Sequence, residues 1–155
     1  MAKNVAVLVV NPVNGAGLFQ YLEAFYENGI SYTTFAVADT KEIRTNSGLA
    51  LTVDDVVANL KGKEDAFEAV VFACGDAMPV FAQNTDKGYN QDLLSVLSVF
   101  VRKGKPVTGH PFAKQFVQGV IPTDEPLEID GNFYTAQTEN TLYQLVPELV
   151  KMLKE

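Results

Sequence analysis

Two short, continuous apolar runs constrain the fold of this chain most strongly. Val5–Val10 contains only valine, alanine and leucine, and Ala69–Ala73 contains only alanine, valine and phenylalanine. Runs of this length without alternation are typical of strands buried on both faces, as in a parallel sheet covered by helices. A segment with apolar residues at helical spacing follows the first run, and Ser31–Val37 is rich in aromatic and β-branched residues. This order predicts a βαβ unit at the start of the chain.

The rest of the chain continues the alternation of strands and helices. Asp130-Gly131 between two apolar runs predicts a β-hairpin, and the segments after it predict a closing helix. Alternating strands and helices over 155 residues predict one α/β domain, residues 1–155, with a mostly parallel sheet. The other predicted elements are an edge strand at Leu49–Val53, a brief helix at Asp54–Leu60, a surface loop at Gln83–Asn90, a helix at Asp92–Lys103, a strand at Lys105–Gly109, the hairpin strands Leu127–Ile129 and Phe133–Thr135, and the final helix Leu142–Leu153.

Charge and cysteine content exclude several classes of function. Twelve basic against nineteen acidic side chains give a net charge of −7, which argues against nucleic acid and anionic membranes as partners. One cysteine and one histidine exclude a disulfide framework and a zinc cluster, and we predict neither a metal nor a cofactor. No apolar run has the length of a signal-peptide core or a membrane helix. We therefore expect a cytoplasmic protein, in which the unpaired Cys74 stays reduced.

Three predicted strand ends are the candidate functional positions, because α/β sheets bind ligands beyond the carboxyl ends of their strands. These ends are followed by Asn11–Gly17, Cys74–Met78 and Gly109–Phe112. The first is a glycine-rich turn in which Asn11 and Gly15 are candidates for binding an anion at a helix N-terminus. The commoner alternative is a tight strand-to-helix turn capped by asparagine.

Cys74 and His110 are the candidate catalytic pair. A cysteine near a helix N-terminus favours the thiolate, and a histidine at a strand end is a natural proton donor or acceptor. Gly75 is a candidate N–H donor to an oxyanion or phosphate, with Asp76 beside it as a candidate ligand-binding residue. Both structural alternatives stay open: Cys74 as inert packing, and His110 as a partner of a loop carbonyl.

The chain also resembles a known family. Gly104–Lys114 is similar to the strand ending in Thr-His-Pro-Leu-Ala-Lys of the DJ-1/PfpI family, and this is the most specific match. Val5–Val10, Ala69–Asp76 and the hairpin at Asp130-Gly131 also look like that family. The resemblance implies a flavodoxin-like three-layer sandwich of the class I glutamine-amidotransferase-like superfamily. Its members are called intracellular proteases, amidases, deglycases or glyoxalases and are commonly dimers, so we expect a homodimer.

The sequence departs from the family at the positions that carry its chemistry. The family nucleophile lies in an Ile-Cys-[Ala/His]-Gly-Pro elbow, and no such run is present. About twenty residues, one βα unit, are missing between the helix at Asp92–Lys103 and His110. The acidic partner of the family is expected near Gly15–Gly17, where the chain has no Asp or Glu. Cys74 matches the first glycine of the family's Gly-Gly pair and Gly75 the second, so Cys74 does not match the family nucleophile by position.

Three functional hypotheses follow. The first is a DJ-1/PfpI-like protein with a degenerate active site, acting as a non-catalytic binding or oligomeric protein. The second is a hydrolase or deglycase acting on small carbonyl or amide substrates, with Cys74 as nucleophile and His110 as base. The third is nucleotide-phosphate binding, because Asn11–Gly15 is similar to the Asn-Pro-x-Ser-Gly turn of lipid and NAD kinases, and Cys74–Met78 to their Gly-Gly-Asp-Gly-Thr loop.

Overall fold

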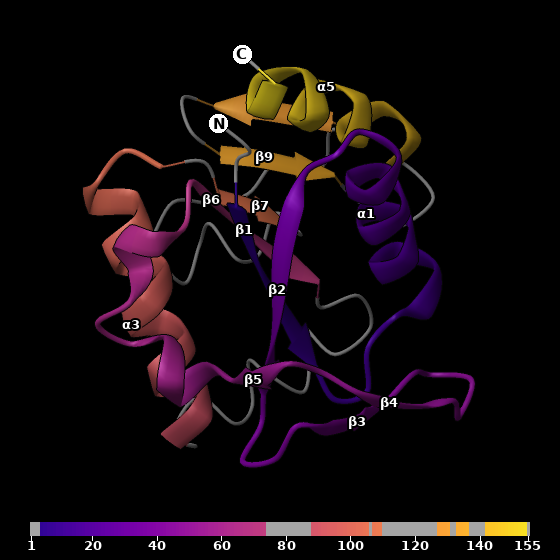
Figure 1. Cartoon of the computed structure of the whole chain (residues 1–155), viewed down its shortest axis with the longest axis vertical. Helices are drawn as coiled ribbons and strands as arrows, with labels where there is room; N and C mark the ends of the chain where they lie inside the picture. The colour runs from indigo at the N-terminus through magenta and orange to yellow at the C-terminus, as the bar shows by residue number, and fades with distance from the viewer. Residues whose placement is uncertain are drawn as a thin grey trace.

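A seven-stranded sheet forms the middle layer of the protein (Figure 1). The computed structural model describes residues 4–73, 88–105, 107–109, 127–130, 133–136 and 142–154. Every neighbouring pair of strands in the sheet is parallel except the last, which is an antiparallel hairpin. The predicted α/β class, with a mostly parallel sheet and a hairpin near the C-terminus, is therefore confirmed. In spatial order the strands are β5 (Asp55–Val56), β2 (Ser31–Val37), β1 (Asn4–Val10), β6 (Ala69–Ala73), β7 (Val107–Gly109), β9 (Phe133–Ala136) and β8 (Leu127–Asp130).

Helices cover both faces of the sheet. α1 (Gly15–Glu27) and α5 (Leu142–Lys154) pack on each other on one face, and α3 (Gly88–Arg102) lies on the other (Figure 1). α1 turns Tyr21 and Phe25 into the core, at the i, i+4 spacing of one helix face. Among the described residues, no helix has the length and apolar character needed to span a membrane.

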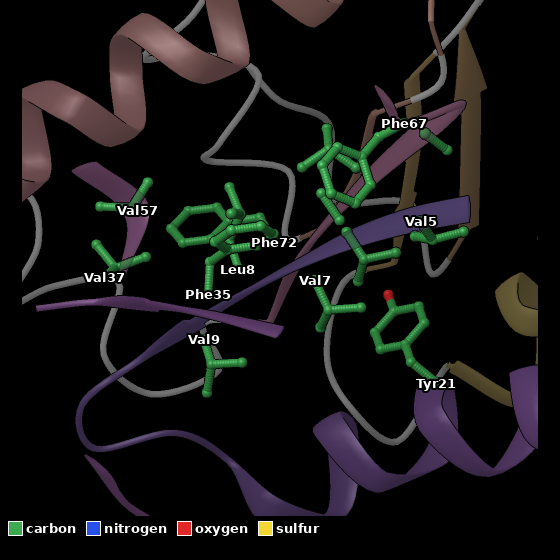
Figure 2. Close-up of a cluster of buried hydrophobic side chains, with 14 of the residues drawn as sticks. Val5, Val7, Leu8, Val9, Tyr21, Phe35, Val37, Val57, Phe67 and Phe72 are labelled. Atoms are coloured by element: carbon green, nitrogen blue, oxygen red, sulfur yellow. The ribbon is translucent and has the colours of Figure 1, made fainter. Parts of the chain in front are cut away.

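β1 is the centre of the hydrophobic core, and six consecutive residues of this strand are buried. Its side chains alternate between the two faces of the sheet. Figure 2 shows Val7 on the same side of β1 as Tyr21, and Leu8 on the other side with Phe35 and Phe72. The first apolar run of the sequence is thus a strand buried on both faces, as its composition predicts.

Most predicted elements are present with closely similar bounds. The strands Ser31–Val37 and Ala69–Ala73 have the bounds that the sequence predicts, and the final helix extends one residue further, to Lys154. α3 begins at Gly88, inside the segment Gln83–Asn90 that was expected to be a surface loop. Polar residues are common both in surface loops and in the first turn of a helix, where the N–H groups lack partners within the helix. The polar residues before Gln91 therefore did not distinguish the start of the helix from a loop.

The helix predicted for Asp54–Leu60 is wrong. Asp55–Val56 pairs with β2 as strand β5, and a single 3-10 turn, Val57–Leu60, follows it. Asp54 is not a helix cap. Its Oδ2 accepts hydrogen bonds from the N–H (2.9 Å) and hydroxyl (3.0 Å) of Thr34, and its own N–H donates to Thr34 Oγ1 (3.0 Å). The Asp54 side chain thus accepts the hydrogen bonds of Thr34, a residue at the edge of β2 that the short strand β5 does not pair with.

A second, small sheet stands apart from the main one. β3 (Glu42–Arg44) pairs antiparallel with β4 (Ala50–Thr52), so the short edge strand predicted at Leu49–Val53 is present as an edge of this small sheet. The hairpin projects beside the N-terminal end of α1 (Figure 1). Gly48 in its turn has a φ of 95°, a left-handed conformation that favours glycine.

α3 passes into β7 through a closed turn. Gly104 has a φ of 68°, and the N–H of Lys105 donates to the carbonyl of Phe100 at 3.0 Å, which is a glycine C-cap of the Schellman type. The ammonium of Lys105 donates to the carbonyl of Phe67 at 2.6 Å, just before β6. These bonds fix the start of β7 against β6.

The ion pair between Lys103 and Asp65 gives a pH prediction. The hydrogen bond from Lys103, followed by its charge, lowers the pKa of Asp65 below the ordinary value of 3.8. A lowered folded-state pKa means that the stability contributed by Asp65 is present above pH 3.8 and is lost as the pH falls through the folded value. We expect Asp65→Asn to reduce the loss of stability below pH 4 in urea unfolding, and high salt to weaken this effect because the pair is exposed. An unchanged pH profile would contradict the prediction.

Candidate functional site

The carboxyl ends of β1, β6 and β7 lie at one edge of the sheet. Val9 pairs with Ala73 across β1 and β6, and Phe72 pairs with Gly109 across β6 and β7. The chain leaves β1 toward β2 on one side and leaves β6 toward β7 on the other, so the topological switch point lies between β1 and β6. Sheets of this order bind ligands at that point. The three predicted strand ends therefore meet at the edge where a site is expected.

Four of the candidate residues lie outside the described residues: Cys74, Gly75, Asp76 and His110. Cys74 directly follows Ala73 in the chain, and His110 directly follows Gly109. Within the ranges that the structure describes, no group of three or more His, Cys, Asp or Glu side chains could hold a metal ion.

The turn between β1 and α1 is fixed by the β3–β4 hairpin. The Asn11–Pro12 peptide bond is cis, and Oδ1 of Asn11 accepts a hydrogen bond from the N–H of Arg44 at 3.0 Å. Val13 donates its N–H to the carbonyl of Arg44 (3.0 Å) and accepts from the N–H of Asn46 (2.9 Å). Asn11, predicted as a ligand-binding residue, thus uses its side-chain oxygen within the chain. Arg44 is 33 positions away, and the sequence carried no local signal of this contact.

Asn14 and Gly15 begin α1. Oδ1 of Asn14 accepts from the N–H of Gly17 at 2.8 Å, so the predicted asparagine cap is confirmed. A Cβ atom on Gly15 would lie 3.3 Å from Cγ2 of Thr45, so glycine at this position allows the hairpin to approach the helix. The first turn of α1 contains no acidic residue. This end of the site offers backbone N–H groups, which can bind an anion, and no carboxylate that could act as a base.

Removal of the cap gives a direct test of this geometry. We expect Asn14→Ala to lower the free energy of unfolding by about 1 kcal/mol, because the Gly17 N–H loses its acceptor. Asn14→Asp keeps an acceptor and places a negative charge at the positive end of the helix, so it is expected to retain the stability. Equal losses in the two variants, measured by urea unfolding, would contradict the capping role.

Comparisons with known proteins identify relatives of this chain. No known family profile matches it. Protein ppBat of Bacteroides thetaiotaomicron is 56% identical over 175 residues, which covers 99% of this chain and 100% of the relative. The crystal structure of a Bacteroides thetaiotaomicron protein with the provisional name protease I has a TM-score of 0.89 at 55% identity, covering 98% of this chain and 99% of that one.

More distant structures share the fold. A DJ-1 superfamily protein of Salmonella typhimurium has a TM-score of 0.80 at 17% identity, covering 97% of this chain and 90% of that one. A ThiJ/PfpI domain protein of Brachyspira murdochii has a TM-score of 0.76 at 13% identity, covering 99% and 97%. The chain belongs to the DJ-1/PfpI family.

This chain is shorter than Protein ppBat. The alignment with Protein ppBat runs over 175 residues against the 155 of this chain, so the relative has about twenty residues without a counterpart here. The resemblance in sequence predicted a missing segment of that size between α3 and His110. At that place the structure has the closed turn at Gly104, and β7 is hydrogen-bonded to β6 on one side and β9 on the other.

Proposed function

We propose that this chain is a DJ-1/PfpI family protein that has lost the family reaction and acts by binding. The observation that carries the proposal is the short connection from α3 to β7. Residues 92–105 and 107–109 are helix, turn and strand, with Pro106 alone between them. A nucleophile elbow needs a strand, a sharp turn and a helix of its own, for which this stretch has no room.

The start of α1 supports the same conclusion. The resemblance places the acidic partner of the family near Gly15–Gly17, and the first turn of α1 has no acidic side chain. The side chains of Asn11 and Asn14 accept hydrogen bonds from Arg44 and Gly17 and serve the scaffold. What this edge keeps is a helix N-terminus beside a switch point, which suits a small anionic or carbonyl ligand.

Turnover assays test the loss of the reaction. We expect no conversion of glyoxal or of a fluorogenic peptide amide above the level of the matched variant Cys74→Ser. We also expect iodoacetamide at pH 6 to label Cys74 no faster than free cysteine, because an ordinary thiol is protonated at that pH. Conversion that is lost in Cys74→Ser and in His110→Ala would overturn the proposal.

The second candidate is a reaction that uses Cys74 and His110. It is favoured by the pairing of β6 with β7, because Cys74 and His110 directly follow the paired ends of these two strands. A cysteine activated by this histidine would be labelled rapidly at pH 6, and His110→Ala would remove the excess rate. The nucleotide-phosphate hypothesis is tested separately by thermal unfolding with Mg-ATP, where an unchanged melting temperature rejects it.

A further inference from the structure

The sequence contains two Asn-Gly pairs, and the fold places one of them at each end of α1. Asn14-Gly15 begins the helix, and Asn28-Gly29 ends it. Asn-Gly pairs are prone to spontaneous deamidation, because glycine has no side chain that would shield its backbone nitrogen or restrict rotation of the peptide. In that reaction the glycine nitrogen attacks the side-chain amide carbon of the asparagine. The backbone must leave its folded conformation first, and the two ends of α1 differ in what opposes this movement.

The N-terminal pair is held by the helix and by the β3–β4 hairpin beside it (Figure 1). Oδ1 of Asn14 accepts the N–H of Gly17 at 2.8 Å, and its main-chain carbonyl accepts the N–H of Leu18 at 3.0 Å. A Cβ atom on Gly15 would lie 3.3 Å from Cγ2 of Thr45, so the hairpin leaves the Asn14–Gly15 peptide little room to rotate. Deamidation at this pair therefore requires the start of the helix to open.

The C-terminal pair lies in a more open environment. Gly29 is exposed, and a Cβ atom built on it would have no neighbour within 4 Å. Its N–H donates to the carbonyl of Tyr26 at 3.3 Å, which is long for a backbone hydrogen bond. Nδ2 of Asn28 donates to the carbonyl of Ala24 at 2.8 Å, within the last turn of the same helix. Helix ends fray at a low cost in free energy, so this pair reaches the conformation needed for attack more often than the capped pair does.

We propose that Asn28 is a site of spontaneous deamidation in the folded protein and that Asn14, in the same Asn-Gly context, is protected. The nitrogen of Gly29 forms a bond to Cγ of Asn28, and the bond from Cγ to Nδ2 breaks. Nδ2 leaves as ammonia with the proton of the Gly29 amide, and a cyclic succinimide remains. Water then opens the ring at Cγ to give aspartate, or at the main-chain carbonyl carbon to give isoaspartate. Water is the only co-reactant, and this inference does not depend on the proposed loss of the family reaction.

Either product destabilises the C-terminal end of α1. A carboxylate cannot donate to the carbonyl of Ala24 as Nδ2 of Asn28 does, and its charge lies at the negative pole of the helix dipole. Isoaspartate also adds a methylene group to the main chain, which displaces the N–H of Ile30 from the carbonyl of Phe25, the 2.9 Å bond that closes the turn into β2. The same change to aspartate at Asn14 keeps the cap acceptor and places the charge at the positive pole. Deamidation thus has opposite consequences at the two ends of one helix.

Peptide mapping of the full chain after incubation at pH 8 tests the site. Tandem mass spectrometry identifies each asparagine that has exchanged its amide NH₂ for OH. In the native protein we expect Asn28 to convert about fivefold faster than Asn14, because an N-cap worth about 1 kcal/mol lowers the open fraction by that factor. Asn46, exposed in the hairpin turn, is followed by Ser47, whose side chain hinders attack, and is expected to convert more slowly than Asn28. Conversion of Asn14 or Asn46 as fast as that of Asn28 would overturn the proposal.

The chain unfolded in guanidinium chloride is the control for sequence context. Both Asn-Gly pairs are then free of structure, so Asn14 and Asn28 are expected to convert at similar rates. If Asn28 keeps the same advantage in the denaturant, the difference comes from neighbouring residues and the structural protection of Asn14 is wrong.

Three variants test the consequence for the helix. Asn28→Asp has the side chain of one product and is expected to lower the midpoint of urea unfolding. Asn14→Asp, which adds the same charge at the other end of α1, is the matched control and is expected to keep the wild-type midpoint. Asn28→Gln keeps an amide whose cyclic imide needs a larger ring, so it is expected to abolish conversion at this position. An Asn28→Asp variant as stable as the wild type, or an Asn28→Gln variant that converts as fast, would contradict the proposal.

Discussion

Phe100→Ala is expected to lower the free energy of unfolding by about 3–5 kcal/mol. The Phe100 side chain on α3 is fully buried, and the ammonium of Lys105 lies 5.7 Å from the centre of its ring. Its carbonyl also accepts the N–H of Lys105, the bond that closes the turn into β7. Truncation to alanine leaves a cavity between α3 and the sheet, on the side where α3 contacts β6 and β7. Urea unfolding with fluorescence or circular dichroism measures the loss.

Phe100→Leu is the matched control for this prediction. Leucine keeps most of the apolar volume, so its expected cost is below about 1.5 kcal/mol. The backbone of residue 100 and its bond to Lys105 are common to both variants, so their difference reports the buried ring alone. Equal costs in the two variants would mean that α3 does not close the core as the structure has it.

Asp54→Ala is expected to lower the free energy of unfolding by about 1–3 kcal/mol, although the Asp54 side chain is itself exposed. The loss falls on Thr34, which is 8% exposed and whose N–H and hydroxyl both donate to Asp54 Oδ2. Without that carboxylate the N–H of Thr34 is buried at the edge of β2 with no acceptor. A hydrogen bond to a charged group contributes more than a neutral one, so the effect is large for a surface position.

Two further variants separate the parts of this contact. Asp54→Asn keeps one acceptor oxygen and is expected to lose less than half as much stability as the alanine variant. Thr34→Val removes the hydroxyl, which donates a hydrogen bond to Asp54 Oδ2 and accepts one from the N–H of Asp54. Because these residues are in direct contact, the double variant Thr34→Val/Asp54→Ala is expected to cost less than the sum of the single changes. Additive costs would show that the two side chains act independently.

The sequence determined the central strands well, because Ser31–Val37 and Ala69–Ala73 are dense in residues that favour strands and are bounded by clear turns. It misplaced Asp54–Leu60, because the carboxylate of Asp54 binds Thr34, twenty positions earlier, and no local pattern reports that contact. It also missed Glu42–Arg44 as a strand, since only the middle residue of those three is apolar and buried. Short elements held by distant partners are thus where local propensity fails.

In the candidate site too, local contacts were predictable from the sequence and long-range contacts were not. The cap by Asn14 was predictable, because an N-cap acts within three residues of itself. The common edge of the three strand ends followed from the alternation of strands and helices, which fixes parallel strands and hence one carboxyl edge. The hydrogen bond from the N–H of Arg44 to Oδ1 of Asn11 was not predictable, because it depends on the β3–β4 hairpin, which the local sequence pattern did not indicate. Long-range contacts therefore decide which side chains at the edge remain available to a ligand.

The hydrogen bonds between the β1–α1 turn and the hairpin have a consequence for local opening. The N–H groups of Val13, Arg44 and Asn46 all lie in bonds that join these two segments. Amide hydrogens in one cooperative unit exchange with solvent at a common opening free energy. These three amides are therefore expected to exchange together, and a ligand that orders the turn would slow deuterium uptake in the hairpin, more than thirty positions along the chain. The hairpin would then report, at a distance, whether the edge of the sheet is occupied.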